Sequence, residues 1–246
     1  MKKIILTGAL LLGMQYGYAK ADMEQMMGAY QQGNYALALT IANENLNDEQ
    51  KSAGNKSLNV AMAHNMLGMI LNNLYENKKA VEHYEKAIAI YNGLPEKEQD
   101  MDTLETSYNN LASIYSNNKK TLSKALELYK KVLVLREDSS SVNHAKRWKT
   151  ALFMARVFMQ QGAYGDARDY LIKANDSSSK LSDKIVILDN FAQLGEVAKY
   201  YKLVLAANQE LLKIVKQFEQ TPEILEAIKG YEKSIIIAKG KLKDEK

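Results

Sequence analysis

Two adjacent asparagines, Asn109 and Asn110, interrupt an apolar helical stripe in the stretch SYNNLASIYSNN, residues 107–118. Asparagine is a poor helix former because its amide competes for backbone hydrogen bonds, so the pair brings no gain in local stability. An amide carries both donors and acceptors and can therefore pair with the main chain of an extended peptide. The pair indicates either a tolerated helix surface or a binding use for the amides, and both interpretations stay open.

Residue types that support catalysis or metal binding do not occur at the required spacings. The histidines His64, His83 and His144 lack metal-ligand spacing, and the chain has no Cys. The sequence contains neither a His-Glu-x-x-His motif, nor Gly-x-Ser-x-Gly, nor a glycine loop that could hold a phosphate. We therefore expect no enzyme activity, no metal site and no cofactor.

The elements that position the asparagines follow from an internal repeat. Large apolar residues recur at intervals of 44, 43 and 33 residues, at Leu67, Leu111, Met154 and Ile187, and another large apolar residue follows each of them by four. Small residues come around 13 positions after the first set, at Ala80, Ala125, Ala167 and near Ala198. This spacing predicts pairs of antiparallel helices in which a small residue faces a large one. Turn residues are expected inside each pair, at Asn77, Asn117, Asn118, Gln161, Gly162 and Gly195.

These repeats resemble the tetratricopeptide repeat (TPR). The resemblance is carried by Leu67-Gly68 in the first helix of a pair and by residues of the second helix, namely Ala80, Tyr84 and Ala87. Repeats of about 42 residues that contain NNLA..Y, present here from Asn109 to Tyr115, are similar to those of kinesin light chains and peptide-sensing bacterial regulators. The resemblance implies an all-α, right-handed solenoid of about five helix pairs. A final helix over about residues 221–240, with Thr221 as N-cap and Pro222 in its first turn, would cap the stack.

The same register predicts which side chains face the concave groove of the solenoid. At 100° per residue, Asn109 lies roughly 110° from the centre of the apolar stripe. We expect a peptide-binding groove lined by Asn65, Met69, Asn72, Asn109, Asn110, Ser113, Ser116, Arg156 and Gln193. Its amides would pair with a peptide main chain, and its thioether would adapt to varied apolar side chains. The implied function is binding of a peptide or protein segment, and the alternative is a self-associating or assembly scaffold for an envelope complex.

The first 21 residues have the pattern of a secretory signal peptide. Lys2 and Lys3 precede an apolar run from Ile4 to Met14, and Ala19-Lys20-Ala21 is a small-x-small cleavage site. We therefore expect a mature TPR domain of residues 22–246 that is periplasmic or secreted. The apolar run is too short to span a bilayer, so no membrane insertion is expected after cleavage.

The charge balance argues against nucleic acid as a partner. The formal net charge is +4, but removal of the three lysines of the leader leaves 30 basic against 29 acidic residues. A nearly neutral chain lacks the excess of basic residues that is typical of proteins that bind nucleic acid. We therefore expect a peptide or protein partner and a monomer or weak homodimer.

Overall fold

The computed structural model describes residues 20–137 and 146–244, and every regular element in these ranges is helical. The chain forms two compact units, Met1–Leu135 and Arg136–Lys246, each of which is described by itself. Within the described ranges, no helix combines the length and the apolar character needed to cross a membrane. The predicted leader lies outside the described residues except for its last two positions, which begin the first described helix, so the leader stays a prediction.

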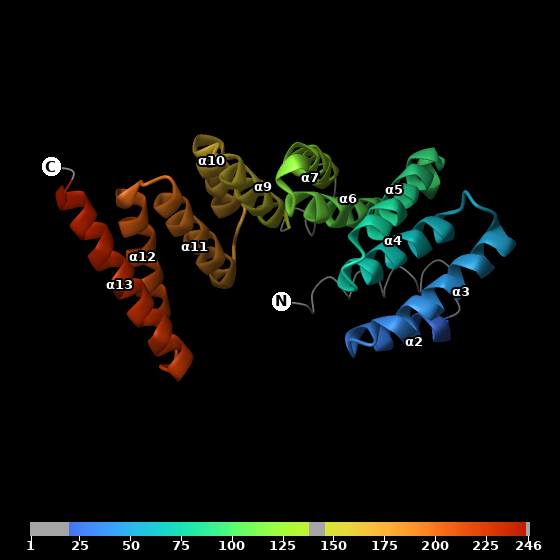
Figure 1. Ribbon diagram of the computed structural model, residues 1–246, viewed down its shortest axis with the longest axis horizontal. Coiled ribbons are helices and arrows are strands. Elements are labelled where there is room, and N and C mark those ends of the chain that lie inside the picture. The colour runs from blue at the N-terminus through green and yellow to red at the C-terminus, as the bar shows by residue number, and fades with distance from the viewer. Residues whose placement is uncertain (1–19, 138–145, 245–246) are drawn as a thin grey trace. The chain divides into compact units, whose positions relative to one another are not determined.

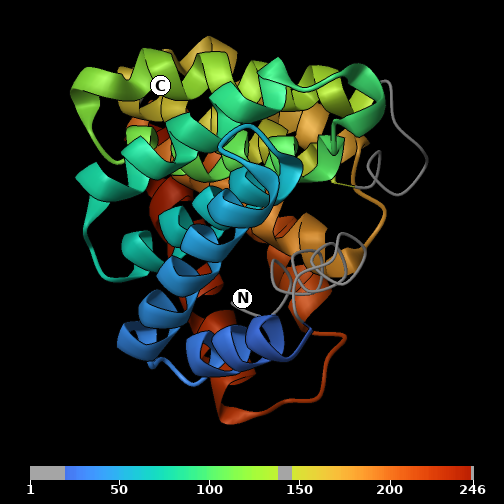
Figure 2. The same ribbon diagram turned by 90° about the vertical axis from the view of Figure 1, so that its right-hand side faces the viewer.

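The first unit consists of consecutive helices that double back on one another (Figure 1). Its elements are α2 (Lys20–Gln31), α3 (Tyr35–Ala53), α4 (Leu58–Asn73), α5 (Asn77–Gly93), α6 (Met101–Ser116) and most of α7 (Leu122–Glu137), with 3-10 turns at Glu96–Glu98 and Lys119–Thr121. From α2 to α6 each helix packs on the next, and α4 also contacts α6. Figure 2 shows the pair formed by α2 and α3 in the foreground.

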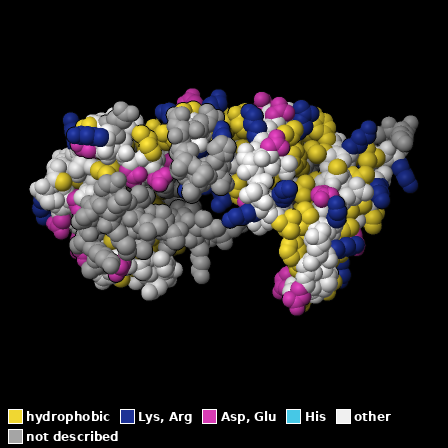
Figure 3. Space-filling model, turned by 180° about the vertical axis from the view of Figure 1, so that it is seen from behind, with side chains coloured by type: hydrophobic (Ala, Val, Ile, Leu, Met, Phe, Trp, Pro, Cys, Tyr) yellow, Lys and Arg dark blue, Asp and Glu magenta, His cyan; other side chains and the backbone are white. Residues whose placement is uncertain are grey.

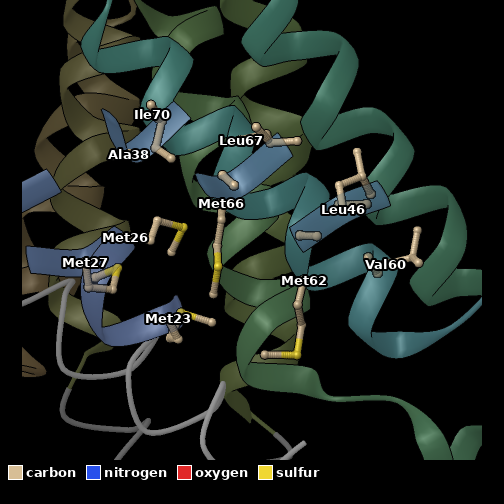
Figure 4. Packing of buried hydrophobic residues seen from close by; sticks show 14 of the residues in the cluster. Met23, Met26, Met27, Ala38, Leu46, Val60, Met62, Met66, Leu67 and Ile70 are labelled. Atoms are coloured by element: carbon tan, nitrogen blue, oxygen red, sulfur yellow. The ribbon is translucent and has the colours of Figure 1, made fainter. Parts of the chain in front are cut away.

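Methionine fills much of the core that α2 and α4 share. Five methionines of these two helices are each at most 5% exposed: Met23, Met26, Met27, Met62 and Met66. They form one cluster with Leu67 and Ile70 (Figure 4). The unbranched thioether side chain can fill irregular gaps between helices.

Three of the small residues predicted at the contacts within helix pairs are buried, since Ala80, Ala125 and Ala167 are 0% exposed. Ala38, the equivalent residue of the first pair, is also 0% exposed. The first helix of the α4–α5 pair comes so close to the second that a Cβ on Gly68 would lie 2.8 Å from the ring of Tyr84. A larger side chain fits at Gly68 only if the Tyr84 ring or one of the helices moves, because protein interiors are close-packed. In this pair the small residue lies on the first helix and the large one on the second, the reverse of the predicted arrangement, while Ala80 of the second helix is buried as predicted.

The second unit repeats the same plan. Its helices are α9 (Arg147–Gln161), α10 (Tyr164–Asp176), α11 (Leu181–Val197), α12 (Tyr201–Val215) and α13 (Pro222–Asp244). Each helix packs on the next, and α9 also contacts α11. The alternate helices α9 and α11 therefore lie side by side. Together the described helices form five pairs and one final helix, which confirms the predicted all-α TPR architecture.

The final helix, α13, begins where the sequence predicts. The carbonyl oxygen of Thr221 accepts a hydrogen bond from the Leu225 N–H at 2.9 Å, and the Thr221 hydroxyl accepts one from the Ile224 N–H at 3.4 Å. The helix continues to Asp244, beyond the expected end near residue 240. Its last turn carries Lys241 and Lys243, and cations stabilise a helix C-terminus through the helix dipole.

One backbone arrangement closes the turns inside four of the helix pairs. A residue just after the first helix has a positive φ of 79°, 62°, 77° or 57°, at Gly33, Tyr75, Gly162 and Lys199 respectively. The N–H of the following residue then bonds to a carbonyl five positions earlier, in the pairs Asn34 to Ala29, Glu76 to Leu71, Ala163 to Phe158 and Tyr200 to Gly195. This is the Schellman motif of helix ends. Because it recurs, it defines equivalent residues in the repeats.

The turns show that the sequence prediction for the last helix pair was wrong by one helical turn. Gly195 is equivalent to Phe158, whereas the sequence alignment placed Phe191 there. Gly195 lies inside α11 rather than in the turn. A Cβ on it would lie 2.7 Å from Val204 Cγ2 and 2.9 Å from the Val204 backbone nitrogen, so this glycine permits α12 to pack closely on α11. The buried position on the second helix is accordingly Val204, and Ala198 is only the C-cap of α11.

The other predicted turn residues lie at or next to helix ends. Asn117, Asn118 and Gly162 lie in turns, as expected. Gln161 is the last residue of α9, and Asn77 is the first residue of α5. Differences of one residue are normal at helix ends, where the backbone frays.

Candidate functional site

Seven of the predicted groove residues lie on α4 and α6, which contact each other in the first unit. Ser113 is exposed, and five more are partly exposed: Met69, Asn72, Asn109, Asn110 and Ser116. Asn65 differs from them because it is buried. The two helices thus offer solvent a mixed surface of amides, hydroxyls and one thioether.

Asn65 of α4 carries an unused hydrogen-bond acceptor. Its side chain is only 9% exposed, and within the described residues its Oδ1 atom accepts no hydrogen bond. A buried acceptor without a donor costs roughly 1–3 kcal/mol in folding free energy. Because this Oδ1 atom is shielded from solvent, a donor from outside the unit reaches it only if the side chain rotates.

The two adjacent asparagines of α6 have different surroundings. The Asn110 amide approaches the hydroxyl of Tyr84 on α5, although the contact falls outside the geometry of a full hydrogen bond. Burial raises the pKa of Tyr84, and the nearby Asn110 amide partly opposes that rise. Asn110 therefore has a contact between successive helix pairs. Asn109 has no comparable contact recorded among the described residues and is partly exposed.

An open pocket of about 420 Å³ lies on the second unit, between α9 and α11. It is lined by Arg156, Met159, Gln160, Gln193 and Val197. The structure thus brings together Arg156 and Gln193, the two residues that the sequence places in a groove on this unit. In the corrected register they occupy equivalent positions of successive repeats, as do Gln160 and Val197.

The guanidinium group of Arg156 is oriented by a buried amide. Arg156 Nε donates a hydrogen bond to Asn190 Oδ1 at 2.8 Å, and Asn190 is 0% exposed. Asn190 is itself held by α11, because its Nδ2 donates to the Val186 carbonyl oxygen at 2.7 Å. On the other side of the pocket, Gln193 Nε2 donates to Asp189 Oδ2 at 2.8 Å. The arginine at this pocket is therefore pre-positioned.

Met159 also lies at a position that the helix register assigns to the groove, but two pocket residues were not predicted there: Gln160 and Val197. The signal for them was present, because Gln160 follows Arg156 by four residues and Val197 follows Gln193 by four, which is the spacing of one helix face. The alignment of the last repeat was off by one turn, so it did not bring Gln160 and Val197 to equivalent positions.

The described residues contain no group of three or more His, Asp or Glu side chains that could hold a metal ion. The chemistry of these surfaces consists of hydrogen bonding by amides, one oriented guanidinium group and apolar contacts. Such groups can recognise the main chain and side chains of another polypeptide.

Comparison with known families agrees with the repeat pattern. Models of the tetratricopeptide repeat match residues 27–93 and residues 105–145. No curated protein sequence matches the chain.

Solved structures with a similar fold cover most of the chain. One of them contains the nearly identical TPR-like repeats of a kinesin light chain from Podosopora anserina. It has a TM-score of 0.69 at 15% identity, over 82% of this chain and 97% of that one. BtubC (BKLC) from P. vanneervenii has a TM-score of 0.62 at 15% identity, over 85% and 89%. The apo form of RapI has a TM-score of 0.61 at 17% identity, over 99% and 94%.

At these identities the similarity concerns the fold. The repeated helix pairs, the buried small residues at their contacts and the family matches all agree. The chain is therefore a tetratricopeptide repeat protein, built as a protein–protein interaction module.

Proposed function

We propose that this chain is an exported interaction module that binds extended peptide or protein segments on its alternate helices, which are α4 and α6 in one unit and α9 and α11 in the other. The observation that carries the proposal is the pocket between α9 and α11, where equivalent positions of two repeats supply Arg156 and Gln193. Repetition of polar positions along a solenoid suits a ligand that is itself repetitive, and an extended main chain is such a ligand.

The first unit contributes groups that can pair with a peptide main chain. The partly exposed amides of Asn72 and Asn109 can each donate and accept, whereas the unused acceptor Asn65 Oδ1 is buried and becomes available only if its side chain rotates. Met69 provides a flexible apolar contact that tolerates different side chains. Together these groups favour binding that depends on main-chain hydrogen bonds more than on one particular sequence.

Paired substitutions test this proposal. The purified protein is titrated with fluorescein-labelled peptides chosen from a random library for binding to it, and anisotropy gives the affinity. Asn65→Ala combined with Asn109→Ala should weaken binding by at most a few kcal/mol, since each neutral hydrogen bond contributes about 0.5–1.5 kcal/mol. Asn92→Ala, at an exposed position near the end of α5, serves as control and should leave the affinity unchanged. Unaltered affinity in the double variant would contradict binding along α4 and α6.

Export is the part of the proposal that depends on the leader alone. The basic, apolar and small-x-small regions of residues 1–21 support it, and we expect the mature protein to begin near Asp22, with Ala19 as the alternative cleavage point. N-terminal sequencing of the native protein from an envelope or extracellular fraction checks this. An intact Met1 on protein from a cytosolic fraction would disprove export.

A second candidate function is self-association through the C-terminal helix. Ile236 and Ile237 of α13 are 70% and 52% exposed, and hydrophobic side chains are visible on the surface of the C-terminal part (Figure 3). Large exposed apolar residues favour a protein contact. If this candidate holds, light scattering should show a dimer that persists in the double asparagine variant and becomes a monomer on Ile236→Glu. A wild-type monomer at all concentrations would eliminate it.

A further inference from the structure

The outer face of the final helix, α13, is left uncovered by the other described helices. α13 packs on α12, and no other described helix has more than marginal contact with it. Its inner side buries Ile228, Ile235 and Ala238, each at most 9% exposed. At 100° per residue, the midpoint of Ile236 and Ile237 lies roughly 160° from the centre of this buried stripe. These two isoleucines therefore point toward solvent, and they are 70% and 52% exposed.

Basic residues surround the exposed isoleucines. Between residues 227 and 243, α13 carries five lysines, all of them exposed: Lys229, Lys233, Lys239, Lys241 and Lys243. The same stretch contains one acid, Glu232, whose Oε1 lies 3.3 Å from Lys216 Nζ. The other acids of α13 lie near its ends, at Glu223, Glu226 and Asp244. Within the described ranges none of the five lysines forms an ion pair, so their charge is available to a ligand.

The lysines and the isoleucines share one side of the helix. Lys229 and Lys233 lie within roughly 30° of the midpoint of Ile236 and Ile237. A lysine can lay its aliphatic chain along an apolar surface while its ammonium group stays in a polar layer. A helix that combines exposed apolar residues with lysines can lie on an anionic lipid surface, where the apolar side chains enter the headgroup boundary and the lysines meet the phosphates.

Other ligands would use only part of this face. A nucleic acid or an acidic polymer would pair with the lysines but would leave Ile236 and Ile237 in water. A second copy of the chain would cover the isoleucines, but a symmetric contact centred on them would place the same lysines on both sides and bring like charges together. An anionic lipid surface offers an apolar layer and negative charge at once, and it therefore matches both kinds of residue.

We propose that the outer face of α13 docks the protein on an anionic lipid surface, with Ile236 and Ile237 in the headgroup boundary and the lysines at the lipid phosphates. The helix lies on the membrane in this arrangement, consistent with the finding that no described helix is long and apolar enough to cross one. The inference goes beyond the proposed peptide binding and does not depend on it, because α13 carries none of the groove residues.

Sedimentation with lipid vesicles tests the inference. The mature protein is used, because the apolar run of the leader would bind lipid by itself. It is mixed with vesicles of phosphatidylcholine alone, or with about one third phosphatidylglycerol, at about 0.05 M and 0.5 M salt. We expect binding to the anionic vesicles to be at least about tenfold tighter than to the neutral ones, and to weaken at the higher salt concentration because salt screens the charges.

Matched lysine variants assign the electrostatic part of the binding to α13. Lys229→Gln combined with Lys233→Gln should weaken binding to anionic vesicles roughly 25-fold, since each lysine near such a surface contributes about fivefold. Lys119→Gln combined with Lys120→Gln removes the same charge from an exposed turn of the first unit and should leave the binding unchanged. Circular dichroism verifies the helicity of both variants.

Matched isoleucine variants assign the apolar part. Ile236→Ser should weaken binding to anionic vesicles about tenfold, because the side chain no longer gains from leaving water. Ile172→Ser, at a position of α10 that is 45% exposed, should leave it unchanged.

Three results would overturn the inference. The first is equal binding to both kinds of vesicle, or no binding to the anionic ones. The second is binding to anionic vesicles that the α13 variants leave unchanged or that the control variants weaken equally. The third comes from light scattering without lipid: a dimer that Ile236→Ser dissociates, in a protein that binds no vesicle, would assign this face to a second copy of the chain.

Discussion

His64 of α4 and His83 of α5 face each other with their Nδ1 atoms 3.0 Å apart, so one imidazole donates a hydrogen bond to the other. Their ring centroids are 5.1 Å apart, and His64 is 6% exposed. Burial, followed by the nearby His83 and Lys86, lowers the pKa of His64 to about 4. Burial and Lys86 also lower the pKa of His83, while Glu82 opposes that change. Both rings are therefore neutral at pH 7, and the contact joins the two helices of one pair.

The free energy of unfolding should fall as the pH decreases from about 6.5 toward 4. The unfolded chain binds a proton at His64 near its ordinary pKa of 6.5, but the folded chain does not until about pH 4. The stability is thus complete above pH 6.5 and decreases through this window, by about 1–3 kcal/mol. Urea unfolding at pH 7.5 and pH 5 measures the difference. His64→Phe should have a smaller pH dependence over this interval, and an equal dependence in both proteins would contradict the assignment.

Overpacking the contact within a helix pair should destabilise the protein. Ala80→Leu or Ala125→Leu places a large side chain where the alanine is 0% exposed, and we expect a loss of about 1–3 kcal/mol in the free energy of unfolding. Asn109→Leu on the partly exposed face of α6 should cost little or stabilise, because leucine has the better helix propensity. Chemical denaturation compares the three variants. If Asn109→Leu is as destabilising as Ala125→Leu, the groove has been assigned to the wrong helix face.

The left-handed residue of the Schellman turns should respond to substitution with opposite signs in two repeats. Tyr75, with φ 62° and 90% exposure, has the conformation that glycine adopts at Gly162 with φ 77°. Tyr75→Gly should stabilise by up to about 1 kcal/mol, because it relieves strain at a position that makes few contacts. Gly162→Ala should destabilise by about 1 kcal/mol for the converse reason. Thermal unfolding of both variants tests this, and a change of the same sign in both would refute it.

Two helical glycines should behave differently when a methyl group is added. Gly195→Ala should destabilise by about 1–3 kcal/mol, because the new Cβ would lie 2.9 Å from the backbone nitrogen of Val204, which cannot move without its helix. Gly230→Ala on α13 meets nothing within 4 Å and should stabilise by about 0.5–1 kcal/mol through helix propensity. Urea denaturation measures both. Similar effects at the two sites would mean that α11 and α12 are less closely packed than described.

The fold was predictable because the repeat leaves a local signal. The alternation of small and large residues at helical spacing identifies the helix pairs, and Thr221 with Pro222 marks the start of the last helix. Gly195 was misjudged because a glycine that permits close packing and a glycine that forms a turn look alike in a sequence.

The candidate site was predictable only in part, because burial depends on neighbouring helices. The sequence places Asn65 and Asn110 on the groove face, but it could not show that Asn65 is buried or that Asn110 approaches Tyr84. The sequence pattern places Arg156 on the groove face, but it does not indicate the hydrogen bond from Arg156 to Asn190, which lies 34 residues away. The contact between His64 and His83 was likewise invisible, since 19 residues separate them.

The Schellman turns are closed by main-chain atoms, and this affects how the protein can change over evolutionary time. The hydrogen bond that closes each turn joins a backbone N–H to a backbone carbonyl, so it does not depend on the side chain at the positive-φ position. Glycine, tyrosine and lysine are all found at this position. Mutation at the bend alters stability slightly but leaves the course of the chain intact. The bends can therefore accumulate substitutions that give each repeat its own surface, while a larger side chain at the buried alanines of the second helices would overpack the helix pair.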